Sequence, residues 1–378
     1  MKVHIFYYGF VSDDGTKVTL GGVQTLLINL TKVLNELGYE VHYYKPSSMD
    51  FESEHYNIKM HGHKSHINPR KTTRRIKETF EHFKNRINPE EDIVLFADDL
   101  ITCKTKGYKT ISLQHGIFWD IPSQIAMSNK LRYCYEWYKK ITGSIRRIIH
   151  SRYVDQMVCV DYNYVNWYRA TVPFPKTKMA VIPNFATLFP MCKKPEGVVN
   201  IMFARRFEPY RGTRVFCDAV SRILNEYANV HVTLAGWGSD EEWLRLRLNK
   251  YKDRVEFTSY KSENTFDLHA NKHIAVVPTI GSEGTSLSLL EAMSSHCAVI
   301  GSDVGGITNI LLDGYNGIIT PSGNSDRLYE AMKYLIDNPD ERDRMAQIGY
   351  DTINKSFSFE TWKSKWARLI ADFVNNNL

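Results

Sequence analysis

The stretch from Ile274 to Met293 constrains the fold of this chain more than any other. Its apolar run, Ile274 to Val277, predicts a buried strand that ends at Pro278. A loop rich in Gly and Ser separates that strand from an apolar-periodic helix, which we expect from about Ser286. A strand, a glycine-containing loop and a helix start bring unpaired backbone N–H groups and the positive end of a helix dipole to one point. The stretch therefore predicts an anion site, most often a phosphate site.

Two glutamates accompany this anion site. Glu283 lies at the mouth of the predicted helix, and Glu291 lies about two turns further in, or roughly 8–12 Å along the axis at 1.5 Å per residue. Because a carboxylate accepts two hydroxyl hydrogen bonds side by side, it suits the cis-diol of a ribose or a sugar. In a plainer interpretation, Glu283 caps the helix and Glu291 is solvated.

The order of residues in this stretch carries a family resemblance. Strand, proline, Ser/Thr-rich loop, Glu-Gly, small residues and then Leu-Leu-Glu-Ala-Met resembles the E-x7-E segment of the retaining nucleotide-sugar glycosyltransferases with the GT-B architecture. In particular it is similar to the large bacterial family that builds polysaccharides and glycolipids. The resemblance implies an α/β chain with two Rossmann-like domains facing across a cleft, and a C-terminal helix that crosses back to the first domain.

The same resemblance sets the expected domain boundaries. The first domain, at residues 1–185, would bind the acceptor, and the second, at residues 199–358, would bind the nucleotide sugar. The linker 186–198 contains two prolines and a glycine and is predicted to be the hinge. Residues 359–378 would pack back onto the first domain as an amphipathic helix.

The second domain is predicted to open with a strand, Val199 to Ala204, followed by a cationic loop. The family pattern in this loop is Gly-Arg-Leu-x-x-x-Lys-Gly, so Arg206 matches its arginine and Arg211 takes the place of its lysine. Arg205 replaces the usual glycine. Two cations on one loop are needed if no metal neutralises a diphosphate leaving group. Without the resemblance, they would be a surface arginine pair.

The resemblance also implies the remaining donor-site residues. Glu283 would bind sugar hydroxyls and orient the donor, and Glu291 would bind the ribose diol. The helix start would hold the diphosphate, and the loop around Tyr260 would approach the base. The expected substrate-binding residues in this half are Gly236, Tyr260, Gly284, Thr285, Ser286, Leu287 and Glu291.

In the first domain, two features match the family. Gly21 and Gly22 open a predicted helix in a strand–helix–strand unit, where the family places a loop beside the donor diphosphate or the acceptor. On its own a Gly-Gly pair is a plain turn. His115 follows a predicted strand, at the edge where parallel sheets bind ligands, and the resemblance implies that it contacts the transferred sugar. On its own it would be a core or loop histidine.

Two sites invite a metal interpretation, but we expect no metal. The segment His61-Gly62-His63 lacks a carboxylate or cysteine that would complete a recognisable ligand pattern. Asp98 and Asp99 follow a predicted strand, and a strand-end loop accounts for them. The implied reaction scheme is also metal-independent and uses no cofactor.

Residues 122–153 interleave Lys and Arg with Tyr, Trp and Ile at helical spacing. This pattern suits an interfacial helix on an anionic membrane. It equally suits a helix with one core face and one solvated basic face, and the sequence leaves both interpretations open. Nucleic acid is not an expected partner, because no groove-reading motif accompanies the charge.

Composition limits the setting of the protein. The chain has 378 residues, 43% of them hydrophobic, which suffices for two domain cores, and no apolar run approaches the ~20 residues that span a membrane. Residues 1–190 hold 26 Lys and Arg against 18 Asp and Glu, so the excess positive charge lies in the first half. Scattered cysteines and a short N-terminal strand without signal-peptide features predict a cytoplasmic protein. If the basic first half meets an anionic membrane, the protein would be peripheral on its inner face.

The sequence thus predicts a retaining glycosyltransferase that moves a hexose or N-acetylhexosamine from a UDP-sugar, or a GDP-sugar, to a glycan or lipid-linked acceptor. The expected catalytic residues are Glu283, His115, Arg206 and Arg211. Three alternatives stay open. A sugar-nucleotide epimerase would act without an acceptor, a phosphorylase would need a cofactor lysine, and a non-catalytic subunit would bind nucleotide sugar without turnover.

Overall fold

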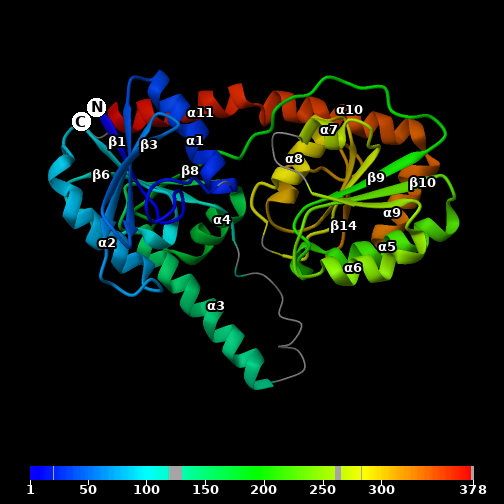
Figure 1. Ribbon diagram of the computed structural model, residues 1–378, viewed down its shortest axis with the longest axis horizontal. Helices are drawn as coiled ribbons and strands as arrows, with labels where there is room; N and C mark the ends of the chain where they lie inside the picture. Colours follow the sequence, from blue (N-terminus) through cyan, green and yellow to red (C-terminus); the bar gives the residue numbers. More distant parts are fainter. Residues whose placement is uncertain (20, 118, 120–129, 260–264, 282, 376–378) are drawn as a thin grey trace. The chain divides into compact units, whose positions relative to one another are not determined.

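The protein is described from a computed structural model, which covers residues 1–19, 21–117, 119, 130–259, 265–281 and 283–375. The chain divides into two compact units (Figure 1). Unit 1 contains Met1–His115, Lys130–Ile182 and the segment from Lys363, and unit 2 contains Pro183–Trp362. Each unit has its own sheet with helices, so the predicted α/β class with two Rossmann-like domains is confirmed.

Unit 1 is built on an eight-stranded sheet in the order β3-β4-β2-β1-β5-β6-β7-β8. All neighbours pair in parallel except β3 and β4, which form an antiparallel hairpin. The strands are β1 (Lys2–Phe6), β2 (Glu40–Ser47), β3 (Phe51–His55), β4 (Ile58–Lys64), β5 (Ile93–Phe96), β6 (Lys109–Gln114), β7 (Gln156–Cys159) and β8 (Lys178–Val181).

The β3–β4 hairpin turns on Tyr56 and Asn57, whose φ angles of 54° and 58° are those of a type I′ turn. Its strand β4 contributes His61 to a buried row of rings that crosses the sheet. In this row His61 Nε2 lies 2.9 Å from Nδ1 of His42, and Nδ1 of His4 lies 2.9 Å from the hydroxyl of Tyr44. His61, which the sequence analysis weighed as a metal ligand, is therefore a core residue.

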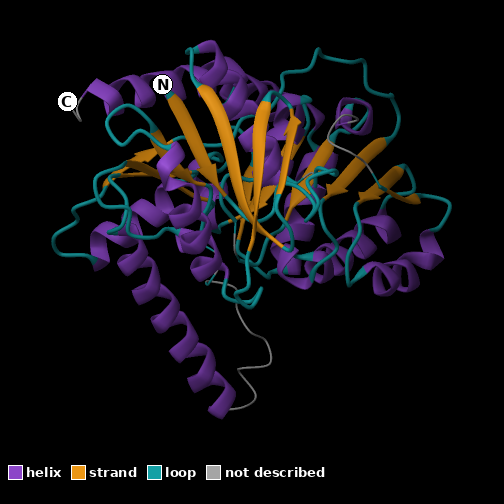
Figure 2. Cartoon of the chain, turned by 60° about the vertical axis from the view of Figure 1, so that its left-hand side comes forward, coloured by secondary structure: helices purple, strands orange, loops and turns teal. Residues whose placement is uncertain are grey.

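The helices of unit 1 connect and cover this sheet. They are α1 (Gly22–Glu36), α2 (Thr72–Phe83), α3 (Lys130–Ser151), α4 (Tyr162–Thr171) and most of α11 (Phe359–Asn375), with short 3-10 turns η1 (Lys84–Arg86) and η2 (Asp99–Ile101). Helix α1 buries Leu27, Leu30 and Leu34 at helical spacing, as its sequence pattern predicts. Helix α3 differs, because it projects from the body of unit 1 (Figures 1 and 2).

Unit 2 has a six-stranded, all-parallel sheet in the order β11-β10-β9-β12-β13-β14. Its strands are β9 (Val199–Ala204), β10 (Val230–Ala235), β11 (Val255–Thr258), β12 (Ile274–Val277), β13 (Ala298–Ser302) and β14 (Ile318–Thr320). Its helices are α5 (Thr213–Glu226), α6 (Glu241–Leu248), α7 (Thr265–His269), α8 (Leu287–Ser294), α9 (Ser325–Asp337) and α10 (Pro339–Ser356), with 3-10 turns η3 (Pro209–Arg211), η4 (Asn249–Tyr251) and η6 (Gly305–Asn309).

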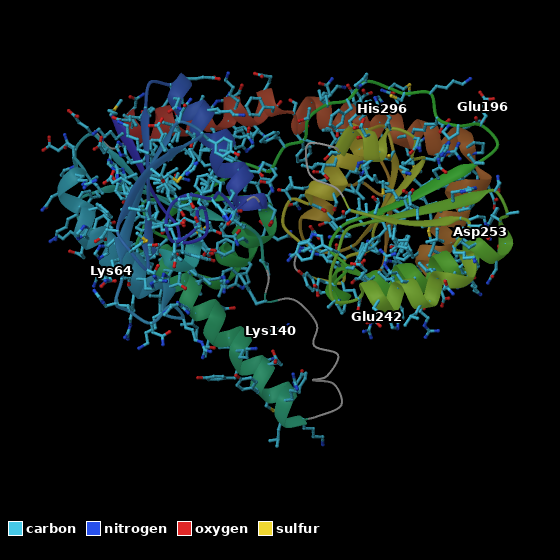
Figure 3. All side chains as sticks on the ribbon, viewed as in Figure 1. Lys64, Lys140, Glu196, Glu242, Asp253 and His296 are labelled. Carbon is cyan, nitrogen blue, oxygen red and sulfur yellow. The ribbon has the colours of Figure 1, made fainter. Side chains whose placement is uncertain are left out.

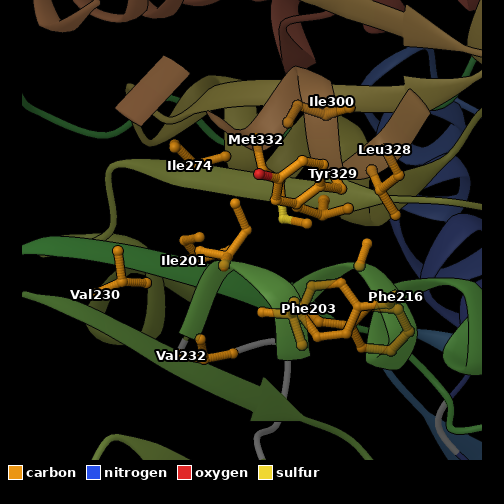
Figure 4. Close-up of a cluster of buried hydrophobic side chains, with 14 of the residues drawn as sticks. Ile201, Phe203, Phe216, Val230, Val232, Ile274, Ile300, Leu328, Tyr329 and Met332 are labelled. Atoms are coloured by element: carbon orange, nitrogen blue, oxygen red, sulfur yellow. The ribbon is translucent and has the colours of Figure 1, made fainter. Parts of the chain in front are cut away.

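Alternate residues of β9 point into two separate cores, as expected for a strand covered on both faces. Ile201 and Phe203 join the core that includes α5, α6 and α9 (Figure 4). Met202 and Ala204 join the core that includes α8 and η6. Phe203 and Phe216 are fully buried with ring centroids 4.8 Å apart, so truncating either to Ala would cost about 3–5 kcal/mol.

The predicted linker 186–198 is bonded to unit 2. Ala186 is buried in a unit 2 core, and its N–H donates to the carbonyl of Phe357 over 3.0 Å. Phe189 stacks on Phe266 at 5.1 Å, and Lys194 donates to the carbonyl of His296. The division between the units falls at Ile182–Pro183 and, on the return, within α11. Among the described residues, no helix is long and apolar enough to cross a membrane.

Candidate functional site: an arginine–glutamate cluster in unit 2

The residues predicted to bind the donor gather where the strand order of unit 2 reverses. From β9 the chain runs outward through β10 and β11, and it returns to pair β12 on the other side of β9. In parallel sheets, ligands bind outside the carboxyl ends of the strands at such a switch point. The loop after β9 carries Arg205 and Arg211, and the loop after β12 carries Thr279 and Glu283.

Glu283 is the centre of a buried cluster. Its Oε2 accepts hydrogen bonds from Nη2 of Arg205 at 2.7 Å, from Nη1 of Arg211 at 2.5 Å and from Oγ1 of Thr279 at 2.8 Å. Arg205 also donates from Nη1 to Oγ1 of Thr279 over 2.7 Å. The four side chains therefore tie the loops after β9 and β12 to each other.

The charges in this cluster do not balance, because two guanidinium groups face one carboxylate. Burial alone would raise the pKa of Glu283, but Arg205 and Arg211 hold it below its ordinary value. Burial lowers the pKa of Arg205, while the pKa of Arg211 is raised because Glu283 and Tyr210 together outweigh the effect of burial. Nε of Arg205 is also buried without a hydrogen-bond partner among the described residues. The cluster carries a surplus of positive charge.

The three arginines of this loop differ in position. The side chain of Arg205 is 5% exposed and that of Arg211 is 18% exposed. Arg206, which matches the family arginine, is exposed, and its Nη2 donates to the hydroxyl of Tyr210 over 3.0 Å. The structure thus brings Arg211 and Glu283 together as predicted site residues, leaves Arg206 outside their contacts, and adds Arg205 and Thr279.

Sequence analysis gave no role to Arg205, because it stands where the family has glycine. A signal was nevertheless present. Arg205 directly follows the apolar strand that ends at Ala204, so it is the arginine of this loop nearest to the carboxyl end of the sheet. Thr279, after Pro278, carried no signal beyond its place in the Ser/Thr-rich loop.

Glycines allow the loops to approach each other closely. A Cβ on Gly212, which has φ +81°, would lie 1.8 Å from the carbonyl oxygen of Pro278. A Cβ on Gly236, a predicted substrate-binding residue, would lie 2.1 Å from the carbonyl oxygen of Arg205. The N–H of Gly306 donates to the carbonyl of Glu283 over 3.0 Å. Gly236 therefore has a packing role that needs no ligand.

Helix α8 begins beside this cluster. Ser286 is its N-cap residue but makes no side-chain capping hydrogen bond, so the first-turn N–H groups are not capped from within. Oγ1 of Thr285 accepts the N–H of Asn184 over 3.3 Å, which anchors the loop to the Pro183–Asn184 segment. Leu287 is 36% exposed.

Glu291 and Gly284, two further predicted donor-site residues, are both half-buried. Glu291 lies in the second turn of α8, where its carbonyl accepts the hydroxyls of Ser294 and Ser295. Tyr260, expected beside the base, lies outside the described residues.

The predicted residues of unit 1 also lie at the carboxyl ends of its strands. His115 follows β6, and its Nε2 is 2.7 Å from the carbonyl oxygen of Ala97. Since a carbonyl only accepts, Nε2 is the donor, and a neutral ring offers Nδ1 as acceptor. Gly21 and Gly22 are exposed at the start of α1, which has no side-chain cap. Within the described part of the chain, no group of three or more His, Cys, Asp or Glu could hold a metal ion.

Comparisons with known proteins agree with this fold. A family model described as Glycosyltransferase Family 4 matches residues 20–188, and one described as Glycosyl transferases group 1 matches residues 199–338. Sucrose-phosphate synthase from Thermosynechococcus elongatus has the same fold, with a TM-score of 0.76, 16% identity and 99% of each chain covered. Anabaena HepE, solved with UDP, gives a TM-score of 0.71 at 13% identity, over 98% of this chain and 100% of HepE.

Two curated relatives have low sequence identity to this chain. A phosphatidyl-myo-inositol mannosyltransferase of Mycobacterium leprae is 25% identical over 182 residues, or 46% of this chain and 48% of the relative. The chain therefore spans about half the length of that enzyme. An uncharacterized glycosyltransferase of Methanocaldococcus jannaschii is 23% identical over 351 residues, or 90% of this chain and 92% of the relative.

The fold defines the class as a two-domain GT-B protein. The two family models follow one another along residues 20–338, and with this fold they show that the chain is a GT-B glycosyltransferase, as the resemblance in the sequence predicts.

Proposed function

We propose that the protein is a retaining, metal-independent glycosyltransferase that moves a hexose or N-acetylhexosamine from a nucleotide diphosphate sugar to a glycan or lipid-linked acceptor, in the biosynthesis of cell-surface polysaccharides or glycoconjugates. The observation that carries this proposal is the arginine surplus around Glu283 at the switch point of unit 2. A diphosphate is the group that such a surplus suits, because charge-assisted hydrogen bonds from guanidinium to phosphate are among the strongest in proteins.

The different exposures of Arg205, Arg206 and Arg211 suggest a different role for each. Arg205 is buried and donates hydrogen bonds to Thr279 and Glu283. It would therefore act as a positioning residue that holds Glu283 in place. The side chain of Arg211 is partly exposed to solvent. It would bind the diphosphate together with the exposed Arg206 and the N–H groups at the start of α8, which no side chain caps. Their role is to stabilise the negative charge that develops on the leaving group.

The remaining predicted residues would orient the sugar. Glu283 would accept hydrogen bonds from sugar hydroxyls through Oε1, since Oε2 already accepts three donors. Glu291 would bind the ribose diol, and His115 would contact the transferred sugar through Nδ1. Exclusion of water on donor binding would prevent hydrolysis of the sugar.

Retention requires that the acceptor attacks from the face that the leaving group vacates. The bond between the anomeric carbon and the β-phosphate oxygen breaks, and a bond from that carbon to the acceptor oxygen forms. The proton of the acceptor hydroxyl passes to the departing phosphate oxygen. No protein nucleophile is needed, so the two-carboxylate scheme of glycoside hydrolases does not apply.

A uridine donor is favoured over a guanosine donor, and the support is indirect. HepE, which has the same fold, was solved with UDP, whereas a matching relative is a mannosyltransferase acting on phosphatidyl-myo-inositol. A lipid-linked acceptor would place the protein on the cytoplasmic side of a membrane. The scattered cysteines, four of them buried, fit a reducing compartment.

A thermal-shift panel of UDP, GDP, ADP and their sugars in EDTA tests donor binding, followed by a transfer assay with the sugar that stabilises most. Arg206→Ala should lower turnover by about 10²-fold or more. Arg245→Ala is the control, because Arg245 is another exposed arginine of unit 2, on α6. Near-normal turnover of Arg206→Ala would remove Arg206 from the diphosphate site.

The same assays separate the proposal from its rivals. Isomerisation of the nucleotide sugar without any acceptor would indicate an epimerase. Tight binding without turnover on any acceptor would indicate a catalytically silent subunit. Failure of every nucleotide to stabilise the protein would contradict all three.

A further inference from the structure

Helix α3 of unit 1 faces the wrong way for an ordinary surface helix. Its polar side is turned toward the unit, where Arg147 is buried with Nε 3.5 Å from Oδ2 of Asp99, and Nδ1 of His150 lies 3.0 Å from Oγ1 of Thr102. A surface helix normally buries its apolar stripe and exposes its polar one. Here the anchor of the helix is polar.

The apolar side of α3 faces outward. We define the α3 stripe as Leu131, Cys134, Tyr138, Ile141 and Ile145, whose spacing of three and four residues places them on one line of the helix. All five are exposed, with Leu131 85%, Tyr138 64% and Ile145 51% accessible. Such a continuous exposed apolar surface marks an interaction site.

Aromatic residues border the α3 stripe. Trp137 and Tyr135 are 60% and 59% exposed, and at 100° per residue they fall on its two opposite edges. Trp and Tyr have an apolar body and a polar tip, so they prefer places where one end is dry and the other is wet. The level of lipid headgroups is such a place.

Positive charge surrounds the same helix. Six Lys or Arg and one carboxylate, Glu136, lie on α3. Lys140 is labelled on its projecting part (Figure 3). Arg146 donates to Oγ1 of Thr73 over 3.0 Å, which brings the start of α2, with the exposed Lys71 and Arg74, beside the base of α3.

We infer that the α3 stripe inserts into the headgroup–acyl boundary of an anionic lipid bilayer, with the helix lying in the membrane plane. A 22-residue helix is about 33 Å long, so it presents an extended apolar line with cations beside it. The spacing of the stripe would also suit a coiled coil with a second copy, but two such helices would oppose cation to cation. Charge therefore favours the anionic surface over self-association.

Vesicle flotation tests this inference without substrates, so its outcome does not depend on the proposed transfer activity. The protein should float with vesicles of phosphatidylcholine containing 30% phosphatidylglycerol, and binding to pure phosphatidylcholine should be at least tenfold weaker. The triple variant Tyr138→Ser, Ile141→Ser, Ile145→Ser should lose more than tenfold in binding. Leu246→Ser, an exposed leucine of unit 2, should bind as the wild type does.

A charge variant separates the electrostatic part. Lys130→Gln, Lys139→Gln, Lys140→Gln should weaken binding to anionic vesicles roughly 100-fold, at about tenfold or less per cation near the surface. The matched control removes three lysines of unit 2 instead, Lys250→Gln, Lys252→Gln, Lys355→Gln, and should change binding little. Equal binding of both charge variants would overturn the inference.

The depth to which the α3 stripe inserts can be measured with a dye on Cys134, which is exposed in the stripe. Cys192→Ser first removes the other accessible thiol. An environment-sensitive dye on Cys134 should shift to the blue on anionic vesicles, and a dye placed on the basic side by Lys139→Cys, Cys134→Ser should shift less. No flotation of the wild type would overturn the inference. So would a dimer in sedimentation analysis that the stripe variant abolishes, because the occupant would then be a second copy.

Discussion

The switch points of the two sheets carry opposite charge balances. In unit 2, Arg205 and Arg211 face one carboxylate, Glu283, whose pKa is held below its ordinary value. In unit 1, Asp98 and Asp99 follow β5 and face one guanidinium, Arg147. Burial and the neighbouring Asp98 raise the pKa of Asp99 to about 7, although Arg147 opposes this. The fold is similar, but among the described residues at the two switch points, the cations outnumber the carboxylates in unit 2 and not in unit 1.

The comparison shows that a buried arginine at a switch point does not by itself make an anion site. Arg147 in unit 1 is even less exposed, at 3%, than Arg205 in unit 2, at 8%. What differs is the number of carboxylates around it. The proposed diphosphate site therefore fits the charge balance of unit 2, and the charge balance in unit 1 would fit a neutral or hydroxyl-rich acceptor.

The largest effect is expected from removing a surplus cation. Arg211→Ala should lower turnover by about 10²- to 10³-fold, because the leaving diphosphate loses a charge-assisted donor in a site shielded from water. The measurement is turnover with saturating donor. Arg214→Ala, in which a more exposed arginine of the same region is lost, should stay within about threefold. If both variants lose equal activity, the surplus has no specific role.

The close approach of the unit 2 loops is the next target. Gly212→Ala forces a Cβ to within 1.8 Å of the carbonyl oxygen of Pro278 at φ +81°. It should lower the free energy of unfolding by about 2–4 kcal/mol, through backbone strain and overpacking. Gly323→Ala has a similar φ of +75° with no atom within 4 Å, and should cost about 1 kcal/mol. Equal losses in chemical denaturation would contradict the packing argument.

The carboxylate excess of unit 1 predicts a pH-dependent difference. Because the pKa of Asp99 is raised to about 7, the folded protein keeps this proton above the pH at which the unfolded chain releases it. The ionisation of Asp99 therefore lowers the free energy of unfolding progressively as pH rises from about 4 to 7. The free energy of unfolding of Asp99→Asn, measured relative to that of the wild type, should therefore increase by about 1–3 kcal/mol from pH 5 to pH 8.

Denaturation at the two pH values measures this gain. Asp253→Asn, an exposed residue of unit 2 (Figure 3), should show no such trend. A gain for Asp99→Asn that is the same at both pH values would mean that Arg147 already compensates both carboxylates.

The smallest expected effect is that of removing metal ions. If the arginine surplus neutralises the diphosphate, EDTA should leave turnover unchanged within about twofold, and added Mn²⁺ should not raise it further. A strict requirement for Mn²⁺ would assign the neutralising role to a divalent ion.

Much of this architecture could be predicted because apolar runs define the parallel strands. Strands β9 and β12 have the predicted bounds, since buried parallel strands read as nearly continuous apolar stretches. The β3–β4 hairpin was missed because its buried residues include His61 and its turn is Tyr56–Asn57 rather than a glycine pair. His61 counted as polar in the sequence, but in the core it pairs with His42 of β2.

The site was less predictable than the fold, because contacts decide it. Position in the family pattern favours Arg206, yet in the structure Arg205 turns inward to Glu283 and Arg206 remains exposed. For α3 the amphipathic pattern was visible, but the sequence could not tell which face the unit holds. The buried Arg147–Asp99 pair decides that question.

The most direct test of the central claim is calorimetric titration, in EDTA, of the nucleotide diphosphate that stabilises the protein most and of its free nucleoside. The account predicts that Arg211→Ala weakens the diphosphate by at least tenfold and leaves the nucleoside unchanged, because only the former uses the surplus charge beside Glu283. Equal affinity of wild type and variant for the diphosphate would contradict the account.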